Sequence, residues 1–385
     1  MKKFIIIMLI AALFVVSLSC RIADNAMISA NGNHTLLIKS DGSLWFWGNI
    51  GGGQLGYDGN ETKWSNQTSP IKIMNDVIAA SSGGGHSLVV KSDGSLWAWG
   101  FNNSGQVGNG TTHDVINPVT IMGEAVEVIA GTFHSLAIKT DGSLWAWGSN
   151  KFGISDIRTT ANNIITPVKI MDDVIAADAG VFHNVVIKSD GSLWTWGLNE
   201  AGQLGEEPSS PFYRIEPVKI MDGVISVSVS KDYNLAIKND GSLWAWGTSS
   251  HPNSGTFISY DATPAKIMDD VIAAETSGSH SFAIKTDSSL WAWGYNENGQ
   301  LGDGTTDSRI TPVKIMEGAI AVSAGDYHGV AIKSDGSLWT WGRNFNGQIG
   351  DSTITTASTN SATWIIEILE DNDRLTPVKI MDSVR

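Results

Sequence analysis

Hydrophobic and polar positions alternate along this chain in a pattern that returns about every 49 residues. The first copy, KSDGSLWFWG from Lys39 to Gly48, has two apolar runs separated by a polar Asp-Gly dipeptide. Close copies start at Lys91, Lys139, Lys188, Lys238, Lys285 and Lys333. A period of that size predicts repeated supersecondary units, each of which needs a neighbour to bury its apolar face.

The Asp-Gly dipeptide predicts a β-hairpin in each copy, because glycine accepts the positive φ that a two-residue turn demands. In the first copy Asp41 and Gly42 form this turn, so we expect Ile38 to pair with Trp45. Side chains alternate across a strand, and both faces of the predicted hairpin are therefore apolar. One face is expected to carry His34, Leu36, Ile38, Trp45 and Trp47, and the other Leu37, Leu44 and Phe46.

A small sheet that is apolar on both faces must lie between two similar sheets, and stacking such sheets around an axis gives a β-propeller. We therefore predict an all-β chain that forms a seven-bladed β-propeller of about 49-residue repeats. A second strand type, PVKIM in most copies, also occurs seven times and ends the chain at Thr376–Arg385. We expect this C-terminal strand to complete the N-terminal blade, closing the ring and removing its free edges.

Three segments of the unit, HSLAIK, LWxWG and NxxGQLG, resemble the repeats of the regulator of chromosome condensation family, whose fold is a seven-bladed propeller. The resemblance covers nearly all of the chain after residue 20. The GQLG element is lost around Phe152 and in Thr248–Ala262, and Ser288 replaces the turn glycine of the sixth copy. The resemblance implies two precedents for function, guanine-nucleotide exchange on a small GTPase and inhibition of β-lactamases.

The first twenty residues, MKKFIIIMLIAALFVVSLSC, predict a secretory signal peptide, because two lysines precede a short apolar run and small residues. Leu18-Ser19-Cys20 resembles the lipobox of bacterial lipoproteins, although Ser17 departs from that pattern. We expect lipid attachment at Cys20 and a single propeller domain from 21 to 385, anchored in the bacterial cell envelope. The alternative is an ordinary signal peptide with a chance cysteine.

The formal charge of the chain is −14, and removing Lys2 and Lys3 with the signal peptide leaves −16. Such a charge argues against nucleic acid or an anionic lipid surface as the main partner. We expect contact with a membrane through the lipid anchor only, and an unknown protein or other macromolecule as the partner.

Histidine occupies one repeat position in six copies, and Tyr233 stands there in the seventh. These histidines are His34, His86, His134, His183, His280 and His328. A ring of imidazoles is a conceivable metal site, but we expect each ring instead to donate a hydrogen bond to a neighbouring loop backbone. The carboxylate pairs Asp172-Asp173 and Asp269-Asp270 fall in predicted turns, where aspartate is favoured locally. We predict no metal and no cofactor.

Unrepeated aromatic residues lie in the long loop between LWxWG and the next PVKIM, and unrepeated residues are candidates for recognition. They are Trp64, Phe212, Tyr213, Phe257, Tyr260 and Trp364. The last of these loops contains an insertion at about 357–371, in which Ile365 and Ile366 follow Trp364. The insertion is either a flap on its own blade or a wedge that grips a partner.

We therefore expect a non-enzymatic binding scaffold that recognises a macromolecule through its variable loops. Strand order predicts that the Asp-Gly hairpins share one face with both termini, while the long loops lie on the other. The alternative is a propeller hydrolase or lyase with an axial pocket. That alternative requires unrepeated polar residues that converge at one point, and we identify none in the sequence.

Overall fold

The structure is a computed structural model that describes residues 26–51, 66–155, 159–250, 257–259, 262–360 and 365–384. For 249–250, 257–259, 357–360 and 365–370 it describes the backbone alone. Cys20, Trp64, Tyr260 and Trp364 lie outside the described residues, as does the predicted signal peptide.

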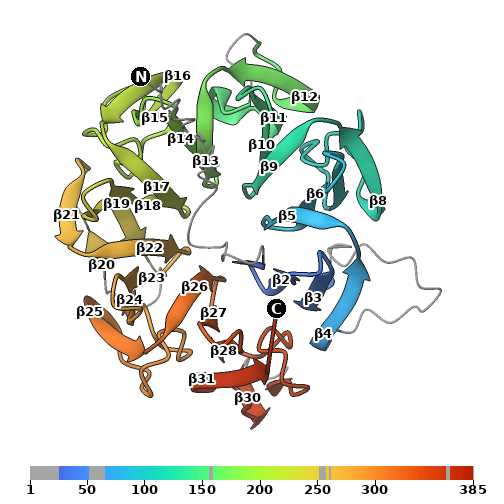
Figure 1. Ribbon diagram of the computed structural model, residues 1–385, viewed down its shortest axis with the longest axis vertical. Helices are drawn as coiled ribbons and strands as arrows, with labels where there is room; N and C mark the ends of the chain where they lie inside the picture. The colour runs from blue at the N-terminus through green and yellow to red at the C-terminus, as the bar shows by residue number, and fades with distance from the viewer. Residues whose placement is uncertain are drawn as a thin grey trace, which may run out of the picture.

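Seven small antiparallel sheets stand around a common axis (Figure 1). The strand nearest the axis in each sheet is β1 (Met27–Asn31), β5 (Val77–Ser82), β9 (Ala125–Ala130), β13 (Val174–Ala179), β17 (Val224–Val229), β22 (Val271–Thr276) or β26 (Ala319–Ala324). The second strand carries the histidine position and is β2 (His34–Ile38), β6 (His86–Lys91), β10 (His134–Lys139), β14 (His183–Lys188), β18 (Tyr233–Lys238), β23 (His280–Lys285) or β27 (His328–Lys333).

The third strand of each sheet carries both repeat tryptophans, and the fourth strand forms the outer wall. The third strands are β3 (Leu44–Gly48), β7 (Leu96–Gly100), β11 (Leu144–Ser149), β15 (Leu193–Leu198), β19 (Leu243–Ser250), β24 (Leu290–Gly294) and β28 (Leu338–Gly342). The fourth strands are β4 (Gln67–Met74), β8 (Val115–Met122), β12 (Asn163–Met171), β16 (Tyr213–Met221), β21 (Ala265–Met268), β25 (Arg309–Met316) and β31 (Arg374–Met381).

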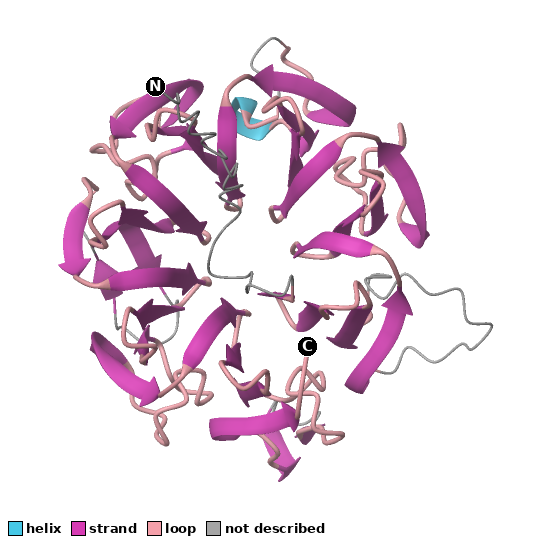
Figure 2. Cartoon of the chain, viewed as in Figure 1, coloured by secondary structure: helices cyan, strands magenta, loops and turns pink. Residues whose placement is uncertain are grey.

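Three further strands and one short helix lie in the long loops. The strand β20 (Phe257–Ser259) pairs with the end of β19, while β29 (Thr356–Asn360) and β30 (Ile365–Glu370) pair with each other. The helix η1 (Lys151–Gly153) is a 3₁₀ turn, and Figure 2 shows it as the single helix among the described residues. None of the described residues forms a helix with the length and apolarity needed to cross a membrane. The predicted all-β, seven-bladed β-propeller is confirmed.

The expected closure of the ring is wrong. The C-terminal strand β31 pairs with β28 as the outer strand of the last blade, with Met381 opposite Leu338. The first blade is complete without it, in the order β1-β2-β3-β4. The error arises because a periodic sequence has no unique starting point, and the PVKIM strand belongs to the blade before it rather than the blade after it.

The last blade instead meets the first through contacts of the kind that join the other blades. Trp47 Nε1 donates to the carbonyl of Gln348 at 2.9 Å, and the backbone N–H of Ala30 donates to Ser323 Oγ at 2.9 Å. One contact depends on the C-terminus, because Val384 is fully buried between the two blades. Its carbonyl also accepts a hydrogen bond from the Ser40 N–H at 3.1 Å.

The hairpin register in each blade differs by one residue from the prediction. Ile38 lies opposite Leu44, and Leu37 lies opposite Trp45. The turn is longer than two residues, since Gly42 donates to the Lys39 carbonyl and Lys39 donates to the Ser43 carbonyl, both at 2.9 Å. Gly42 has a φ of 76°, and Ser288 holds the equivalent position of the sixth copy at 64°.

This change of register places the tryptophans on the opposite face from the histidines. Trp45 and Trp47 share a face with Leu37 and pack against the last blade. His34, Leu36 and Ile38 share the other face with Leu44 and Phe46, and this face packs against the second blade. Both faces are apolar, as predicted, so the argument for stacked sheets holds although the assignment of residues to faces was wrong.

The first tryptophan of each W-x-W is held by its own hairpin. Asp41 Oδ1 accepts hydrogen bonds from the Ser43 N–H and hydroxyl, and Trp45 Nε1 donates to Ser43 Oγ at 2.9 Å. The indole-to-serine bond recurs in all seven blades. The repeated D-G-S-L-W sequence is therefore a local device that fixes the turn and the first indole.

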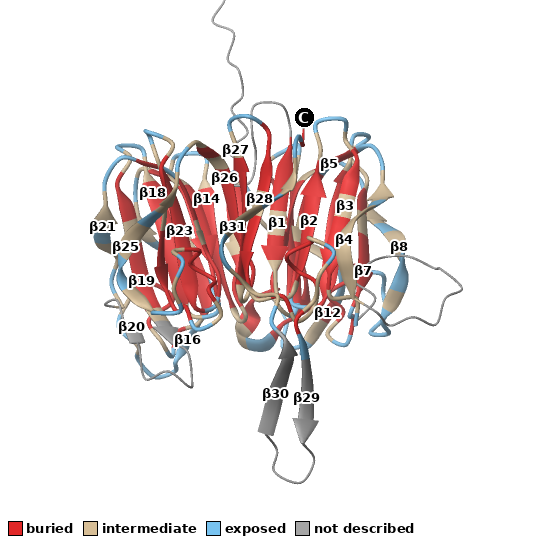
Figure 3. Ribbon diagram, turned by 90° about the horizontal axis from the view of Figure 1, so that it is seen from below, coloured by how far each residue is buried: buried red, intermediate tan, exposed pale blue. Residues whose placement is uncertain are grey.

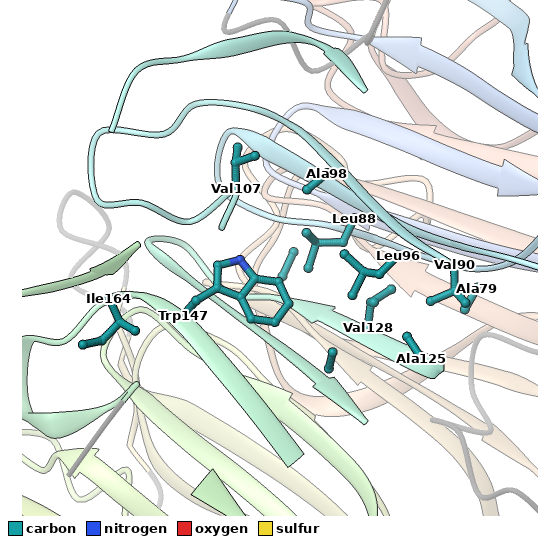
Figure 4. Close-up of a cluster of buried hydrophobic side chains, with 12 residues drawn as sticks. Ala79, Leu88, Val90, Leu96, Ala98, Val107, Ala125, Val128, Trp147 and Ile164 are labelled. Carbon is teal, nitrogen blue, oxygen red and sulfur yellow. The ribbon is translucent and has the colours of Figure 1, made fainter. Parts of the chain in front are cut away.

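The second tryptophan of each W-x-W fastens its blade to the preceding one. Trp147 lies in a buried cluster with Leu88 and Val107 of the preceding blade (Figure 4). Its Nε1 donates to the Gln106 carbonyl at 2.8 Å. Trp246 and Trp341 make the same bond to the carbonyls of the corresponding glutamines. The GQLG element therefore supplies the acceptor, in a position that an indole from the next blade can reach.

One blade lacks this bond and provides a matched comparison. Trp293 Nε1 has no partner among the described residues, and the preceding long loop is one that lost GQLG. We expect Trp246→Phe to lower the free energy of unfolding by about 1 kcal/mol more than Trp293→Phe, because only Trp246 loses a hydrogen bond. Urea unfolding followed by circular dichroism measures the difference. Equal losses in the two variants would show that the bond to the Gln203 carbonyl contributes nothing to stability.

Candidate functional site

The two ends of the propeller carry different kinds of connection. The Asp-Gly turns and the links from each fourth strand to the next blade lie on one end, which we call the hairpin face. The turns that precede the histidine position and the long loops lie on the other end, which we call the loop face. Figure 3 shows the C-terminus on the hairpin face, as the strand order predicts.

Four of the six histidines link neighbouring blades through side chains. His134 Nε2 lies 2.7 Å from Asn184 Oδ1, and His86 Nε2 lies 2.8 Å from Ser135 Oγ. His183 and His328 make equivalent contacts with Asn234 and Thr35. The partner is therefore a side chain of the next blade and not a loop backbone, which corrects our expectation. His280 lacks this contact because Gly329 stands at the partner position, and His34 Nε2 also has no partner among the described residues.

Burial keeps these imidazoles neutral near pH 7. It lowers the pKa of His34, His134 and His183 to about 4. It lowers the pKa of His86, His280 and His328 to about 3. Among the described residues, no three side chains of His, Cys, Asp or Glu lie close enough together to hold a metal ion.

The aspartate pairs lie in the links between blades on the hairpin face. Asp172 pairs with Lys169 at 2.6 Å, and Asp269 pairs with Lys266 at 2.5 Å. Asp173 and Asp270 adopt positive φ values of 63° and 62°, which aspartate tolerates in turns. Both pairs therefore have the turn role that the sequence predicted.

A cluster of aromatic side chains lies on the loop face over the third and fourth blades. Phe133 stacks on Phe182 with ring centroids 5.6 Å apart, and Phe152 meets Phe182 edge to face at 5.7 Å. The Tyr213 ring centroid lies 5.5 Å from that of Phe152, and Phe212, which precedes Tyr213 in the chain, has half of its surface exposed. We call Phe133, Phe152, Phe182, Phe212 and Tyr213 the aromatic cluster.

Local backbone structure brings these rings together. Phe152 adopts a φ of 64° within η1, in the loop that lost the GQLG element. The Ile154 carbonyl still accepts Trp196 Nε1 there, at 3.4 Å, so the loop keeps its contact with the next blade while a phenylalanine occupies the surface. Lys151 Nζ lies 5.0 Å from the centroids of both Phe152 and Phe182. The cluster thus combines exposed apolar area with a cation.

Sequence reasoning found part of this cluster. Phe212 and Tyr213 were predicted from the variable loop. Phe133 and Phe182 were missed because each occupies a single variable position inside a repeated segment, directly before the histidine. The residue at that position varies among the blades, and this variation is the signal that was available: Asn33, Gly85, Phe133, Phe182, Asp232, Ser279 and Tyr327.

The other predicted contact residues are placed only in part. Phe257 lies in β20, and Ile365 and Ile366 lie in β30, where the backbone alone is described. Strands β29 and β30 form a sheet of their own, with Thr356 opposite Glu370 and Asn360 opposite Ile365. The insertion is thus a β-hairpin that adds no strand to a blade.

A cavity of about 410 Å³ lies on the axis, lined by residues of all seven inner strands and of the turns on the loop face. Four unrepeated carboxylates from different blades line it: Glu127, Asp178, Glu275 and Asp326. The expectation that no unrepeated polar residues converge is therefore wrong. Burial raises the pKa of Asp178 to about 7 and also raises the pKa of Asp326.

Hydrogen bonds from blade to blade form the wall of this cavity. Ser81 Oγ accepts the Ala130 N–H at 2.9 Å, and Ser228 Oγ accepts the Thr276 N–H at 3.0 Å. Asp178 replaces serine at this repeat position, and its Oδ2 accepts the Val229 N–H at 2.7 Å. A carboxylate at this position therefore continues the wall and also adds charge to the cavity.

Comparison with known proteins places the chain in a family. The family model of the RCC1-like domain matches residues 15–278. The model of the regulator of chromosome condensation (RCC1) repeat matches residues 287–332. Protein RCC2 of Mus musculus is 35% identical over 85 residues, which is 22% of this chain and 16% of that protein. The ultraviolet-B receptor UVR8 of Arabidopsis thaliana is 33% identical over 93 residues, which is 23% of this chain and 20% of that protein. The matches therefore span a fifth or less of these relatives.

Solved structures agree on the fold. Human WBSCR16 superposes with a TM-score of 0.72 at 20% identity, covering 88% of this chain and 94% of that one. Prp20p of Saccharomyces cerevisiae superposes with a TM-score of 0.73 at 19% identity, covering 93% of this chain and 88% of that one. The family model matches more than half of the sequence, and the seven blades and the repeated motifs agree with this match. The chain therefore belongs to the family of RCC1-like domains.

Proposed function

We propose that this propeller is a non-enzymatic scaffold that binds a macromolecular partner, most directly a protein, through its loop face. The observation that carries the proposal is the aromatic cluster. Phe133 is 39% exposed and Phe212 50%, although most of the hydrophobic side chains of the blades are buried. Exposed aromatic residues that gather in one place are typical of the centres of protein interfaces.

The relatives support a protein partner. Prp20p has been characterised for its binding to Gsp1p and histones, and yeast RCC1 has been crystallised with Kap60 bound to it. These are properties of those proteins. They make protein binding the first function to test for a propeller of the same fold. The exchange-factor precedent that the sequence resemblance implies has an intracellular partner, and export of the chain argues against it. Inhibition of a β-lactamase is the second precedent, and both use the propeller as a binding surface.

The hairpin of β29 and β30 belongs to the same proposal. It arises from the long loop of the last blade, which opens onto the loop face. Because it adds no strand to a blade, the propeller does not need it for its main-chain pairing. We propose that it is a wedge that contacts the partner together with the aromatic cluster.

The hydrolase or lyase alternative draws its support from the axial cavity. A carboxyl group with a pKa of about 7, such as that of Asp178, has the acidity that general acid–base chemistry requires. Both oxygens of this carboxylate accept backbone N–H groups, from Ala179 at 2.8 Å and Val229 at 2.7 Å. Because both oxygens are used in these bonds, Asp178 is part of the wall of the cavity. We therefore favour the binding scaffold over the hydrolase or lyase.

We further propose that the chain is exported and lipid-anchored at Cys20. In the propeller the first described strand, β1, starts at the hairpin face, so an anchor close before it would direct the loop face away from the membrane. Metabolic labelling with a radioactive fatty acid tests this part of the proposal, and a chain that takes up no label contradicts it.

Binding at the loop face is tested by affinity capture with the immobilised chain. We expect Phe212→Ser to lose the protein that the wild-type chain captures, because the variant removes the most exposed ring of the aromatic cluster. The matched control is Ile310→Ser, which removes a side chain of 66% exposure from the outer strand β25. A partner that Phe212→Ser retains and Ile310→Ser loses would place recognition on the outer wall instead.

A further inference from the structure

The guanidinium group of Arg343 lies over two aromatic rings on the loop face. Arg343 directly follows β28, and its backbone N–H donates to the Tyr327 carbonyl at 2.9 Å, which fixes the start of the long loop of the last blade. The Arg343 Cζ lies 4.5 Å from the ring centroid of Phe345 and 5.2 Å from that of Tyr327. Aromatic rings attract a cation through their faces. The two rings therefore hold the guanidinium in position.

Arg343 has no carboxylate partner, unlike the other arginines whose side chains the structure describes. These pair as Arg214 with Glu206, Arg309 with Asp303 and Arg374 with Asp351. Arg343 makes no ion pair and no side-chain hydrogen bond with any described residue. The chain has 39 Asp and Glu residues against 25 Lys and Arg, so its own carboxylates are in excess. A cation that stays unpaired in such a chain is available to a ligand.

The nitrogen atoms of this guanidinium differ in their access to solvent. The Arg343 Nε is enclosed and has no hydrogen-bond partner among the described residues. Nη1 and Nη2 also have no partner in the described chain, but they are not enclosed. A guanidinium presents its N–H groups in one plane, in a geometry that matches the two oxygens of a carboxylate. The accessible Nη groups therefore suit a carboxylate that arrives from outside the chain.

The carboxylates near Arg343 make other bonds. Asp373 Oδ1 accepts the Asn344 N–H at 2.7 Å. Burial raises the pKa of Asp373, and the nearby charge of Arg343 opposes this rise. Glu297 accepts the hydroxyl of Tyr295, which also interacts with the charge of Arg343. One cation with two carboxylates in its surroundings favours a ligand of single negative charge, because a phosphate group would be repelled more strongly.

A cation of the aromatic cluster has the same arrangement. Lys151 is exposed, lies over the rings of Phe152 and Phe182, and makes no ion pair with a described residue. Five lysines of the outer strands, in contrast, each pair with the acidic residue three positions later: Lys169, Lys219, Lys266, Lys314 and Lys379. Arg343 begins the loop that carries β29 and β30. Both parts of the proposed binding surface therefore have an unpaired cation beside aromatic rings.

We propose that the protein partner of the loop face presents an aspartate or glutamate carboxylate, which binds the Nη groups of Arg343 while apolar neighbours of that residue lie against Phe345 and Tyr327. This inference rests on the proposed function and names the chemistry that the partner must supply. The partner is thus a protein with an acidic side chain among apolar or aromatic ones, and its contact with Arg343 lies where the loop of the last blade leaves the propeller.

Titration of the purified full chain with three blocked peptides tests the carboxylate site without the partner. The peptides have the sequence Gly-Phe-X-Phe-Gly, where X is glutamate, glutamine or phosphoserine, and ligand-observed NMR measures their dissociation constants. We expect the glutamate peptide to bind about fivefold or more tightly than the glutamine peptide, because only glutamate forms charge-assisted hydrogen bonds. Added salt is expected to reduce this preference. A glutamine peptide that binds as well, or a phosphoserine peptide that binds more tightly than the glutamate peptide, overturns the proposal.

A variant then locates the site. Arg343→Gln is expected to abolish the preference for glutamate over glutamine, and Arg343→Lys to retain part of it, because lysine keeps the charge without the planar group. The matched control is Lys231→Gln, which removes an exposed cation from the turn before Tyr233 on the same face and is expected to keep the preference. Tryptophan fluorescence checks that each variant is folded. A preference that persists in folded Arg343→Gln contradicts the assignment, and the wild-type peptide comparison decides if that variant does not fold.

Capture of the protein partner separates this inference from the proposed function. We expect both Phe212→Ser and Arg343→Gln to lose the protein that the wild-type chain captures. If Phe212→Ser loses it and folded Arg343→Gln retains it, the loop face binds the partner but the contact with Arg343 is wrong. If both variants retain it, the proposed function is contradicted as well.

Discussion

At pH 5 the protein is expected to have lost most of the free energy of unfolding that it has at pH 7.5. Six histidines are buried with a pKa of about 3 or 4, whereas the ordinary value is 6.5. Their folded pKa lies below their unfolded pKa, so the unfolded chain binds more protons below pH 6.5. Stability is therefore complete above pH 6.5 and is lost as the pH falls from 6.5 towards 4.

The expected loss is large because the histidines act together. Each contributes about 2 kcal/mol at pH 5, and six contribute on the order of 10 kcal/mol, which is comparable with the total stability of a domain. Asp178 acts in the opposite direction, because its folded pKa of about 7 lies above the ordinary 3.8. Protonation of Asp178 raises the free energy of unfolding by about 2 to 3 kcal/mol as the pH falls from 7.5 to 5. Asp326 acts in the same direction as Asp178.

Urea unfolding followed by tryptophan fluorescence at pH 7.5, 6 and 5 measures this dependence. In His134→Gln the slope of stability against pH is expected to fall by roughly a sixth, because one of six titrating groups is removed while glutamine can still reach Asn184. The exposed His113 is the matched control, and His113→Gln is expected to leave the slope unchanged. A urea midpoint that is the same at pH 5 and pH 7.5 would contradict the account of the histidines.

Removal of the C-terminal strand is expected to have the second large effect. A chain that ends at Asp373 loses β31, which leaves β28 as an unpaired edge and uncovers the apolar side chains beneath it. We expect it to be unfolded or to have lost more than about 5 kcal/mol of stability. A chain that ends at Asp382 keeps β31 and loses Val384, which is fully buried between the first and last blades. We expect this shorter truncation to cost about 1.5 to 3 kcal/mol, the value of burying a valine.

Thermal and urea unfolding of the two truncated chains separate the roles of the strand and of the closing residue. We expect the full chain to be the most stable, the chain ending at Asp382 to be less stable, and the chain ending at Asp373 to be the least stable. If the chain ending at Asp382 is as stable as the full chain, Val384 does not help to close the ring. If both truncations leave the unfolding midpoint unchanged, β31 is not part of the last blade.

The period and the apolar character of both hairpin faces were enough to predict the number of blades and the fold. These features were not enough to predict the register of the hairpin. The Asp-Gly turn begins at Lys39 and includes Ser43, and this additional residue moves Trp45 and Trp47 to the other face. The identity of the blade that holds β31 was also beyond the sequence, since a repeat can be divided at any point without changing its period.

The candidate site was predicted less completely than the fold. Phe212 and Tyr213 stand out because aromatic residues at their positions in the long loop are not repeated in the other copies. Phe182 is a single substitution within a repeated turn, and its significance depends on Phe152 from the neighbouring blade, which the sequence does not place beside it. Asp178 was hidden in the same way, because only the ring brings its carboxylate to the axis with those of other blades.

The central claim is that the partner is recognised on the loop face. Site-specific photo-crosslinking tests it directly, with a photoreactive phenylalanine analogue placed either at position 212 or at position 124. Phe212 is half exposed on the loop face, and Glu124 is exposed on the hairpin face. We predict a crosslinked product with the same partner from position 212 and none from position 124. A product from position 124 alone would show that the hairpin face binds the partner and would contradict the account.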